Sequence, residues 1–314
     1  MEIELATFVN RHFETPAVIV GSSPNLEHFC FDTFEGVVIG VGDSPLRCLN
    51  LFQTDYWVVA NSYWPRPWCS RDASALNDVE PQAAFIASTM FAYQNPEDFS
   101  TMQRLIRENV RVPLVIFRTT HGNFEELDVS LLDTSDKRCN KVSSLSIQEL
   151  VAKLAGSEGK YSSGSSSAVH ALALALIMGC SPINIIGVDL PHWLHDYRYY
   201  CPLGWRKTIK KYGSMGPFCE DFTRPEFKAR FRVSGPLRHE AEMLRSRVFS
   251  FLGKPIASDF GAHRVSLMND FQYLARVAAD RVGKTDVFVN SSRSALSEMM
   301  GFQFKSCHCG TVHK

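Results

Sequence analysis

Short apolar runs recur through the first part of this chain, separated by segments of mixed polarity. Each run is apolar at successive positions, a pattern typical of strands that are covered on both faces, as in parallel sheets. The alternation predicts repeated strand–helix units and a mainly parallel sheet flanked by helices. The runs are AVIVG (17–21), VVIGVG (37–42), DYWVVAN (55–61), AAFIAS (83–88) and PLVIF (113–117).

Helix signals lie between and after these runs. The segments 23–29 and 44–52 open with Ser-Pro, and proline at the first helical position loses no hydrogen bond. The run AVHALALALIMGC (168–180) is apolar almost all round, which predicts a buried helix that ends near Gly179. The following run, INIIGVDL (183–190), predicts another central strand.

The pattern changes after residue 190. The region 191–258 is rich in aromatic residues, Lys, Arg, Pro and Gly, a composition that favours a lid over a site rather than a core layer. Beyond it the chain returns to regular patterns. These predict helices over 239–253 and 266–283, a strand over 285–290 and a short helix over 292–300.

Composition narrows the class of protein. The chain has 314 residues, 45% of them hydrophobic and 21% charged, which excludes disordered, collagen-like and coiled-coil proteins. Lys+Arg 33 balances Asp+Glu 33, so the charge argues against a strongly basic nucleic-acid binder. A nucleic-acid acceptor guided by the basic region 204–211 stays open but is not favoured.

Targeting features favour a cytoplasmic protein. The N-terminus lacks a basic segment followed by an apolar run, so we expect no signal peptide. The longest apolar stretch, 168–180, is shorter than the roughly 20 residues of a membrane span. The 9 scattered cysteines suit reduced thiols. Cys307 and Cys309, with histidines nearby, favour a polar tail over a metal site.

Two segments have the character of anion-binding turns. The first is Gly21-Ser22-Ser23, where a strand turns directly into a helix, and where helix N–H groups attract phosphate. The full dinucleotide-binding spacing is absent, so an ordinary turn remains an alternative. The second, which we call the serine cradle, precedes the buried helix and contains Lys160, Ser162, Ser163 and Gly164.

One aspartate and two histidines are the remaining candidate site residues. Asp189 follows the apolar run that starts at 183, at the edge where open α/β sheets place their ligands, although a structural role is equally consistent with this position. His263 lies in an expected loop just before a helix, and His239 has a similar setting. Asp-x-Asp, HExxH, GxSxG and P-loop patterns are absent, which argues against metal hydrolases, serine hydrolases and kinases.

Taken in order, these segments resemble a known family. A strand ending in Gly/Ser-Pro, VGDS, VVANSYW, SSG before ALALALIMGCSPINIIGVDL, a histidine loop and DVFVNSSRSAL are similar to bacterial lipooligosaccharide sialyltransferases and the motility-associated-factor glycosyltransferases. The resemblance spans about residues 16–300. It implies a Rossmann-like sheet with a smaller lid, of the kind called GT-A-variant-like, and a CMP-activated sugar bound without metal.

The resemblance also implies roles for individual residues. Gly21, Ser22 and Ser23 match the turn beside the nucleotide, and Asp43 stands where the family has asparagine. Asn61 matches a donor-contacting asparagine. Ser163 matches a serine near the cytidine and phosphate, with Lys160 in place of an arginine. In the lid, Tyr197 and its neighbour Tyr199 match a tyrosine on the leaving phosphate, and His263 matches the base in preference to His239.

The resulting domain assignment has four parts. We expect a Rossmann-like nucleotide-binding domain over 1–190, a lid over 191–258, a return to the main domain over 259–305 and a tail over 306–314. The segment 259–305 would supply the loop that carries the catalytic base, a helix and the last strand.

The implied activity is metal-independent inverting glycosyl transfer. A nucleotide sugar serves as co-substrate with no further cofactor, and the acceptor is a hydroxyl of a glycan, a protein or another molecule. By analogy with the family, the chain is expected to form homo-oligomers. Two alternatives stay open: a pterin or nucleotide pyrophosphokinase-like enzyme, and a non-catalytic nucleotide-binding protein, which the altered asparagine positions favour.

Overall fold

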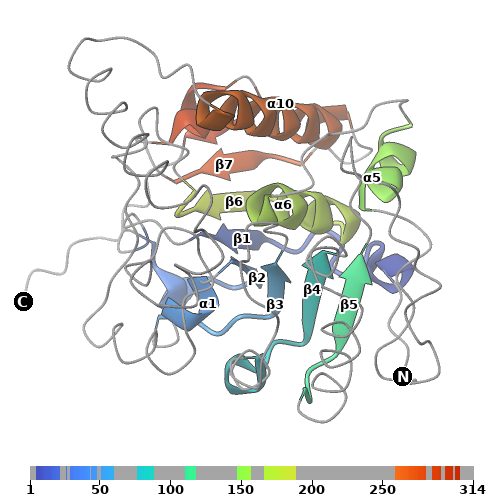
Figure 1. Cartoon of the computed structure of the whole chain (residues 1–314), viewed down its shortest axis with the longest axis vertical. Coiled ribbons are helices and arrows are strands. Elements are labelled where there is room, and N and C mark those ends of the chain that lie inside the picture. Colours follow the sequence, from blue (N-terminus) through green and yellow to red (C-terminus); the bar gives the residue numbers. More distant parts are fainter. Residues whose placement is uncertain are drawn as a thin grey trace, which may run out of the picture.

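The computed structural model describes the central sheet and the helices packed on it (Figure 1). The lid, with His239, Tyr197 and Tyr199, and the tail lie outside the described residues, so neither the lid nor the domain boundaries are tested. The same holds for the helix expected over 239–253. The described residues are 5–21, 26, 29–42, 44–47, 51–59, 76–87, 110–117, 147–156, 166–188, 259–280, 285–290, 294–299 and 301–304.

The described strands form one eight-stranded sheet in which every neighbouring pair is parallel. The predicted α/β class with a mainly parallel sheet is therefore confirmed. The strand order is β5-β4-β3-β2-β1-β6-β7-β8. The strands are β1 (Ala17–Val20), β2 (Val37–Val41), β3 (Tyr56–Val59), β4 (Ala83–Ala87), β5 (Leu114–Phe117), β6 (Ile183–Ile186), β7 (Val287–Val289) and β8 (Gln303–Phe304).

The central strands are apolar at successive positions because both faces of the sheet are covered. On β1, Ala17 and Ile19 belong to the main core, while Val18 and Val20 belong to a second cluster on the opposite face. This second cluster is closed by aromatic rings around η3 (Phe31–Thr33), with Phe31 stacked on Phe52 at 4.7 Å between ring centroids. Burial on both faces is the property that the apolar runs predict.

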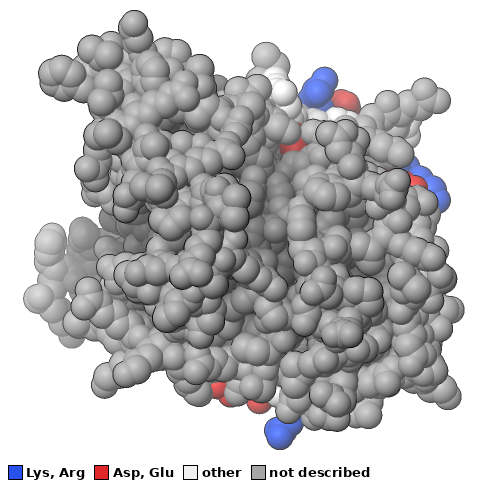
Figure 2. Space-filling model, viewed as in Figure 1, with Lys and Arg blue, Asp and Glu red and all other residues white. Residues whose placement is uncertain are grey.

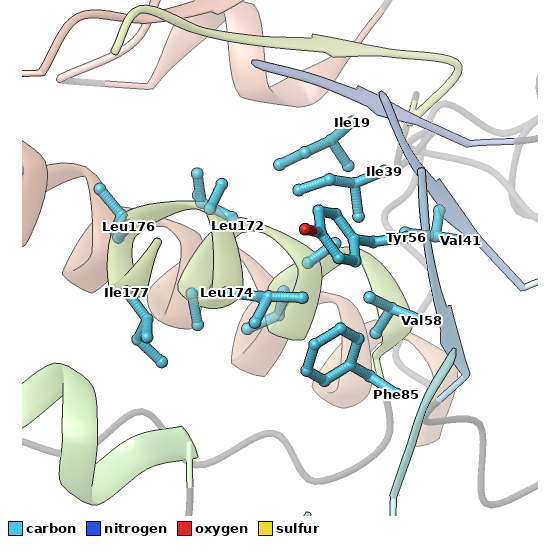
Figure 3. Packing of buried hydrophobic residues seen from close by; sticks show 14 of the residues in the cluster. Ile19, Ile39, Val41, Tyr56, Val58, Phe85, Leu172, Leu174, Leu176 and Ile177 are labelled. Atoms are coloured by element: carbon cyan, nitrogen blue, oxygen red, sulfur yellow. The ribbon is translucent and has the colours of Figure 1, made fainter. Parts of the chain in front are cut away.

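The main core lies between the sheet and helix α6 (Ser167–Ile177). In Figure 3, side chains of α6 such as Leu172 and Leu174 lie over Ile39 and Tyr56 from the strands. Every side chain of α6 from Val169 to Ile177 is buried, because α5 (Ile147–Ala155) and α10 (Asp259–Asp280) pack on it as well as the sheet. The predicted buried helix is confirmed.

The N-terminal segment 5–16 packs against the C-terminal end of α6. It begins with η1 (Leu5–Phe8), whose Leu5 and Phe8 are buried in the main core. Backbone N–H groups of Asn10, His12 and Glu14 then donate to the carbonyl oxygens of Ile177, Met178 and Gly179, at 2.9, 2.8 and 2.9 Å. These bonds satisfy carbonyls that a helix end leaves without partners. Gly179 has φ +84, so the helix ends where the sequence predicts.

Several elements differ from the expectation. Helix α10 begins at Asp259 rather than at 266, while α5, β8 and η1 have no counterpart in the sequence prediction. The helix expected at 44–52 is confirmed at its start as α1 (Ser44–Arg47). The short helix expected at 292–300 is a 3-10 turn, η7 (Ala295–Glu298).

Two observations bear on the compartment. Among the described residues, no helix is long and apolar enough to cross a membrane. Cys30 is disulfide-bonded, whereas Cys180 is buried and forms no disulfide. The expectation of reduced thiols is therefore wrong at Cys30, because disulfides persist in oxidising compartments. The cytoplasmic location stays a prediction, and the cysteines no longer support it.

Charged side chains avoid the interior. Asp270 is the charged residue among the buried polar side chains of the described part. In the space-filling view, the described Lys, Arg, Asp and Glu side chains that can be seen lie at the periphery of that face (Figure 2). The described core is consequently held together mainly by apolar packing, and its buried polar side chains lie on helices α5, α6 and α10 as well as near the ends of strands.

Candidate functional site

The candidate site is built on the two central strands, β1 and β6. They are neighbours in the sheet, but β2 lies on the far side of β1 and β7 on the far side of β6. The chain therefore leaves the carboxyl ends of β1 and β6 in opposite directions. Open α/β sheets bind ligands at such a switch point, outside the carboxyl ends of the strands.

Two glycines lie against each other at this point. The N–H of Gly21 donates to the carbonyl oxygen of Ile186 at 2.8 Å. A Cβ added at Gly21 would lie 2.1 Å from the carbonyl oxygen of Gly187, a distance that no side chain tolerates. Gly187 has φ +70, which glycine adopts without strain. The two strand ends consequently pack against each other through backbone alone, which fixes their spacing at the carboxyl edge of the sheet.

The end of β2 is fixed beside them. The hydroxyl of Ser44, on α1, donates to the carbonyl oxygen of Val20 at 2.6 Å and accepts from the N–H of Val41 at 3.0 Å. The carbonyl oxygen of Gly42 accepts from Nε1 of Trp57 at 2.7 Å. These bonds hold the residues on either side of position 43 at the carboxyl edge.

The end of β6 has a similar attachment. The hydroxyl of Ser294, immediately before η7, donates to the carbonyl oxygen of Val188 at 2.6 Å and accepts from the N–H of Leu296 at 3.3 Å. Val188 directly precedes Asp189 in the chain. Ser294 is buried, so this attachment is shielded from water.

Helix α6 begins at the same edge. Its C-terminal carbonyls are capped by residues that precede β1, so its C-terminus lies at the amino edge of the sheet and its N-terminus at the carboxyl edge. Ser166 is the N-cap, and its side chain accepts from the N–H of Val169 at 3.4 Å. The serine cradle ends directly before Ser166, where the positive end of the helix dipole favours an anion.

Most of the sequence-predicted site residues lie outside the described part. Gly21 is described, at the switch point, and the backbone of His263 is described on α10. For several others, the described residues next to them in the chain lie at the carboxyl edge: Gly42 and Ser44 flank Asp43, and Val188 precedes Asp189. The positions outside are Ser22, Ser23, Asp43, Asn61, Lys160, Ser162, Ser163, Gly164, Asp189, Tyr197, Tyr199 and His239.

His263 is on a helix and not in a loop, which corrects the sequence expectation. It is in the second turn of α10, which continues through Gly261. A glycine inside a helix costs about 1 kcal/mol relative to alanine, which is why the local sequence predicts a loop at this point. The chain leaves α10 for the amino end of β7, so the helix starts from the carboxyl side of the sheet (Figure 1).

Sequence reasoning missed Ser44 and Ser294 as parts of the edge. The local pattern indicates Ser44 only as the start of a helix, and Ser294 only as part of a helical segment. A serine just after a buried strand and before a helix is a usable signal, because its short hydroxyl can reach strand-end backbone groups.

The described groups with shifted pKa values lie at the opposite, amino edge. Nε2 of His12 lies 2.7 Å from the hydroxyl of Tyr56, which donates to Oε1 of Gln82 at 3.3 Å. Burial lowers the pKa of His12, as does the nearby Arg11, and burial raises the pKa of Tyr56. The residues of this network lie before β1, at the first position of β3 and just before β4, so the network does not belong to the candidate site.

No described residues form a group of three or more His, Cys, Asp or Glu side chains that could hold a metal ion.

Comparisons with known proteins found likeness in fold only. No protein-family model and no curated protein matches the chain. A structure of the sialyltransferase CstII from Campylobacter jejuni with cytidine-5'-monophosphate aligns with TM-score 0.42 and 10% identity, over 92% of this chain and 85% of that chain. A CstII structure with CMP-3FNeuAc aligns with TM-score 0.28 and 13% identity, over 56% of this chain and 65% of that chain.

Proposed function

We propose that this protein is a metal-independent inverting glycosyltransferase that moves a sugar from a CMP-sugar-like donor to an acceptor hydroxyl. The observation that carries the proposal is the switch point at Gly21 and Gly187, which lies at the carboxyl edge of the sheet, the edge at which α6 also begins. A strand switch point and a helix N-terminus at one edge suit a phosphate-containing ligand. The acceptor is the hydroxyl of a glycan, a protein or another molecule.

The proposed reaction is a single displacement. His263 takes the proton of the acceptor hydroxyl as its oxygen forms a bond to the anomeric carbon. The bond between that carbon and the donor phosphate oxygen breaks, and the electron pair leaves with the nucleotide. The serine cradle and the hydroxyls of Tyr197 and Tyr199 would stabilise the phosphate, in the role that a divalent cation has in other transferases.

The position of His263 supports this role in one respect. Its helix, α10, starts from the carboxyl side of the sheet, where the switch point lies. The sequence resemblance independently matches His263 to the base. His239 remains the second candidate for the base.

The test is nucleotide release from a panel of nucleotide sugars, measured in EDTA with a mixture of acceptors. We expect release from a CMP-sugar, undiminished by EDTA, and a loss of roughly 10²-fold or more in His263→Ala. His239→Ala is the matched control and should retain activity. Both variants should bind CMP as the wild type does, because a base acts on the acceptor.

Other outcomes would replace the proposal. Release only from ATP and only with Mg²⁺ would favour the pyrophosphokinase-like alternative. Saturable CMP binding without turnover of any donor would favour a non-catalytic nucleotide-binding protein. Equal turnover by the wild type and His263→Ala would remove His263 from the mechanism.

A further inference from the structure

Aromatic rings cover the second cluster, on the face of the sheet opposite the main core. The cluster consists of apolar side chains from β1, β2 and β6 together with Leu26. The rings are partly buried and pack on one another as well as on the cluster. Phe31 stacks on Phe52 at 4.7 Å between ring centroids, and Phe29 lies 4.8 Å from Phe31. We call the residues Phe29, Phe31, Phe34 and Phe52 the aromatic cover.

The hydrogen bonds described for the aromatic cover are local. The N–H of Phe29 donates to the carbonyl oxygen of Leu26 at 3.2 Å. The N–H of Phe34 donates to the carbonyl oxygen of Phe31 at 3.1 Å. These bonds shape the turn, whereas the contacts described between the cover and the strands are apolar. The ring of Phe34 also lies against Gly36, where an added Cβ would be 2.7 Å from its Cζ atom.

Cys30 lies within the aromatic cover and is disulfide-bonded. It directly precedes η3, between Phe29 and Phe31, so the disulfide ties the cover covalently to another part of the chain. Cys30 is only partly buried, so a small thiol in solution can reach its sulfur. Cys180, in the main core, is fully buried and forms no disulfide. The two cysteines therefore differ in both bonding and accessibility.

The main core does not include the aromatic cover. It lies on the opposite face of the sheet, where α6 packs, and is much larger than the second cluster. Loss of the cover would expose side chains such as Val18 and Val20 and leave the packing of α6 in place. Because different parts of a protein open with different free energies, the cover can detach while the sheet stays folded.

We propose that the disulfide of Cys30 is a redox-sensitive clamp, which holds the aromatic cover on the sheet when oxidised and releases it when a dithiol reduces it. One thiolate of the dithiol attacks a sulfur of the disulfide to form a mixed disulfide, and its second thiol then displaces the cysteine. The dithiol gives up two electrons and two protons and becomes a disulfide, while the protein gains two thiols. The clamp is closed in an oxidising compartment and open in a reducing one.

The experiment compares the purified chain after incubation with glutathione disulfide or with reduced dithiothreitol. Alkylation followed by mass spectrometry reports the state of Cys30, and hydrogen exchange reports the opening of the peptide 29–36. On reduction we expect exchange in this peptide to become roughly thirtyfold faster or more, the factor that the loss of a typical disulfide produces. Exchange in 169–177 of α6 should not change, and reoxidation should restore the slow exchange.

Two variants serve as controls. Cys30→Ser should show the fast exchange of 29–36 with and without dithiothreitol. Cys180→Ala removes a cysteine that forms no disulfide and should respond to dithiothreitol as the wild type does. If Cys30→Ser is recovered unfolded, wild type that has been reduced and alkylated at Cys30 takes its place, since its disulfide cannot form again.

Three results would overturn the clamp. Cys30 that is a free thiol or carries glutathione after oxidation is not in a disulfide of the protein. Cleavage of the disulfide without faster exchange in 29–36 means that packing alone holds the aromatic cover. An equal acceleration in 29–36 and in α6 means that the disulfide stabilises the whole fold rather than the cover.

Discussion

Gly21 and Gly187 are in contact where the two central strands end, and the contact leaves no room for a side chain. A Cβ on Gly21 would lie 2.6 Å from the carbonyl carbon of Gly187 and 2.9 Å from a methyl group of Val188. Backbone and a buried side chain would both have to move. The sequence indicates a turn at Gly21, but only the pairing of β1 with β6 shows that the glycine lies against the backbone of Gly187.

Gly21→Ala should destabilise the protein by about 3 kcal/mol or more, because the strand ends must separate. It should also abolish CMP binding. The control is Gly156→Ala, where φ is +59 and nothing lies within 4 Å of the added Cβ. That change should cost about 1–2 kcal/mol through backbone strain alone. Urea unfolding measures both, and equal losses would contradict the close contact at Gly21.

His12 is a titratable residue in a polar network at the amino edge. The Tyr56 hydroxyl donates to Oε1 of Gln82 at 3.3 Å, and its oxygen also lies 2.7 Å from Nε2 of His12. Gln82 donates to one carboxylate oxygen of Asp55, and Val38 N–H donates to the other, at 3.0 and 2.8 Å. The network ties the N-terminal segment to the starts of three strands.

The pKa of His12 predicts the pH dependence of stability. Burial, and then the charge of Arg11, lower this pKa from 6.5, while Asp55 raises it. The unfolded chain then binds the proton more tightly, so stability falls as the pH drops from 6.5 toward the lowered pKa of the folded state. The free energy of unfolding, measured between about pH 7.5 and pH 5.5, should fall more in the wild type than in His12→Gln. Identical slopes would exclude His12 as the source.

At the scale of elements, the N-terminal segment 5–16 and α6 depend on each other. The segment caps three carbonyls at the end of α6, and Phe8 packs edge-on against Phe85 and Tyr56, at 4.9 and 5.9 Å between ring centroids. Its sequence carries no strong helix or strand pattern. Contacts with α6 and with aromatic side chains of the strands hold the segment in place. Its own sequence does not, which explains why the sequence analysis assigned it no structure.

Phe8 and Phe13 form a matched pair that tests this dependence. Phe8 is fully buried, whereas Phe13 is 55% exposed. Phe8→Ala should lower the free energy of unfolding by about 3–5 kcal/mol through the cavity that it leaves. Phe13→Ala should change it by no more than about 0.5 kcal/mol. Chemical denaturation of both variants is the measurement, and similar small effects would show that the segment contributes little to stability.

Other elements show where the local sequence pattern is sufficient to predict the structure. The apolar runs located seven of the eight strands, β1 to β7, because full burial requires apolar residues at every position. The missed strand, β8, has only two residues, Gln303 and Phe304, too few to show a pattern. The start of α10 was missed because Phe260 and Gly261 have the local character of a turn, whereas the helix runs through them.

At the scale of the whole molecule, strand order decides where a site can be. The chain visits β1 to β5 in sequence toward one edge of the sheet, then returns through α5 and α6 to place β6 beside β1. That return brings together Gly21 and Gly187, which lie far apart in the chain. It also sets the N-terminus of α6 at the carboxyl edge of the sheet, where the ring of His170 packs on Phe117 of β5.

The sequence by itself determined the fold class, seven of the eight described strands, the buried helix with its end at Gly179, and the turn at Gly21. Those features follow from local rules: apolar runs for covered strands, and glycine where φ is positive. Only the tertiary structure decided the strand order, the contact between Gly21 and Gly187, the bonds of the Ser44 hydroxyl to the ends of β1 and β2, and the helical setting of His263. These depend on groups distant in sequence, whose packing and hydrogen bonds no local pattern encodes.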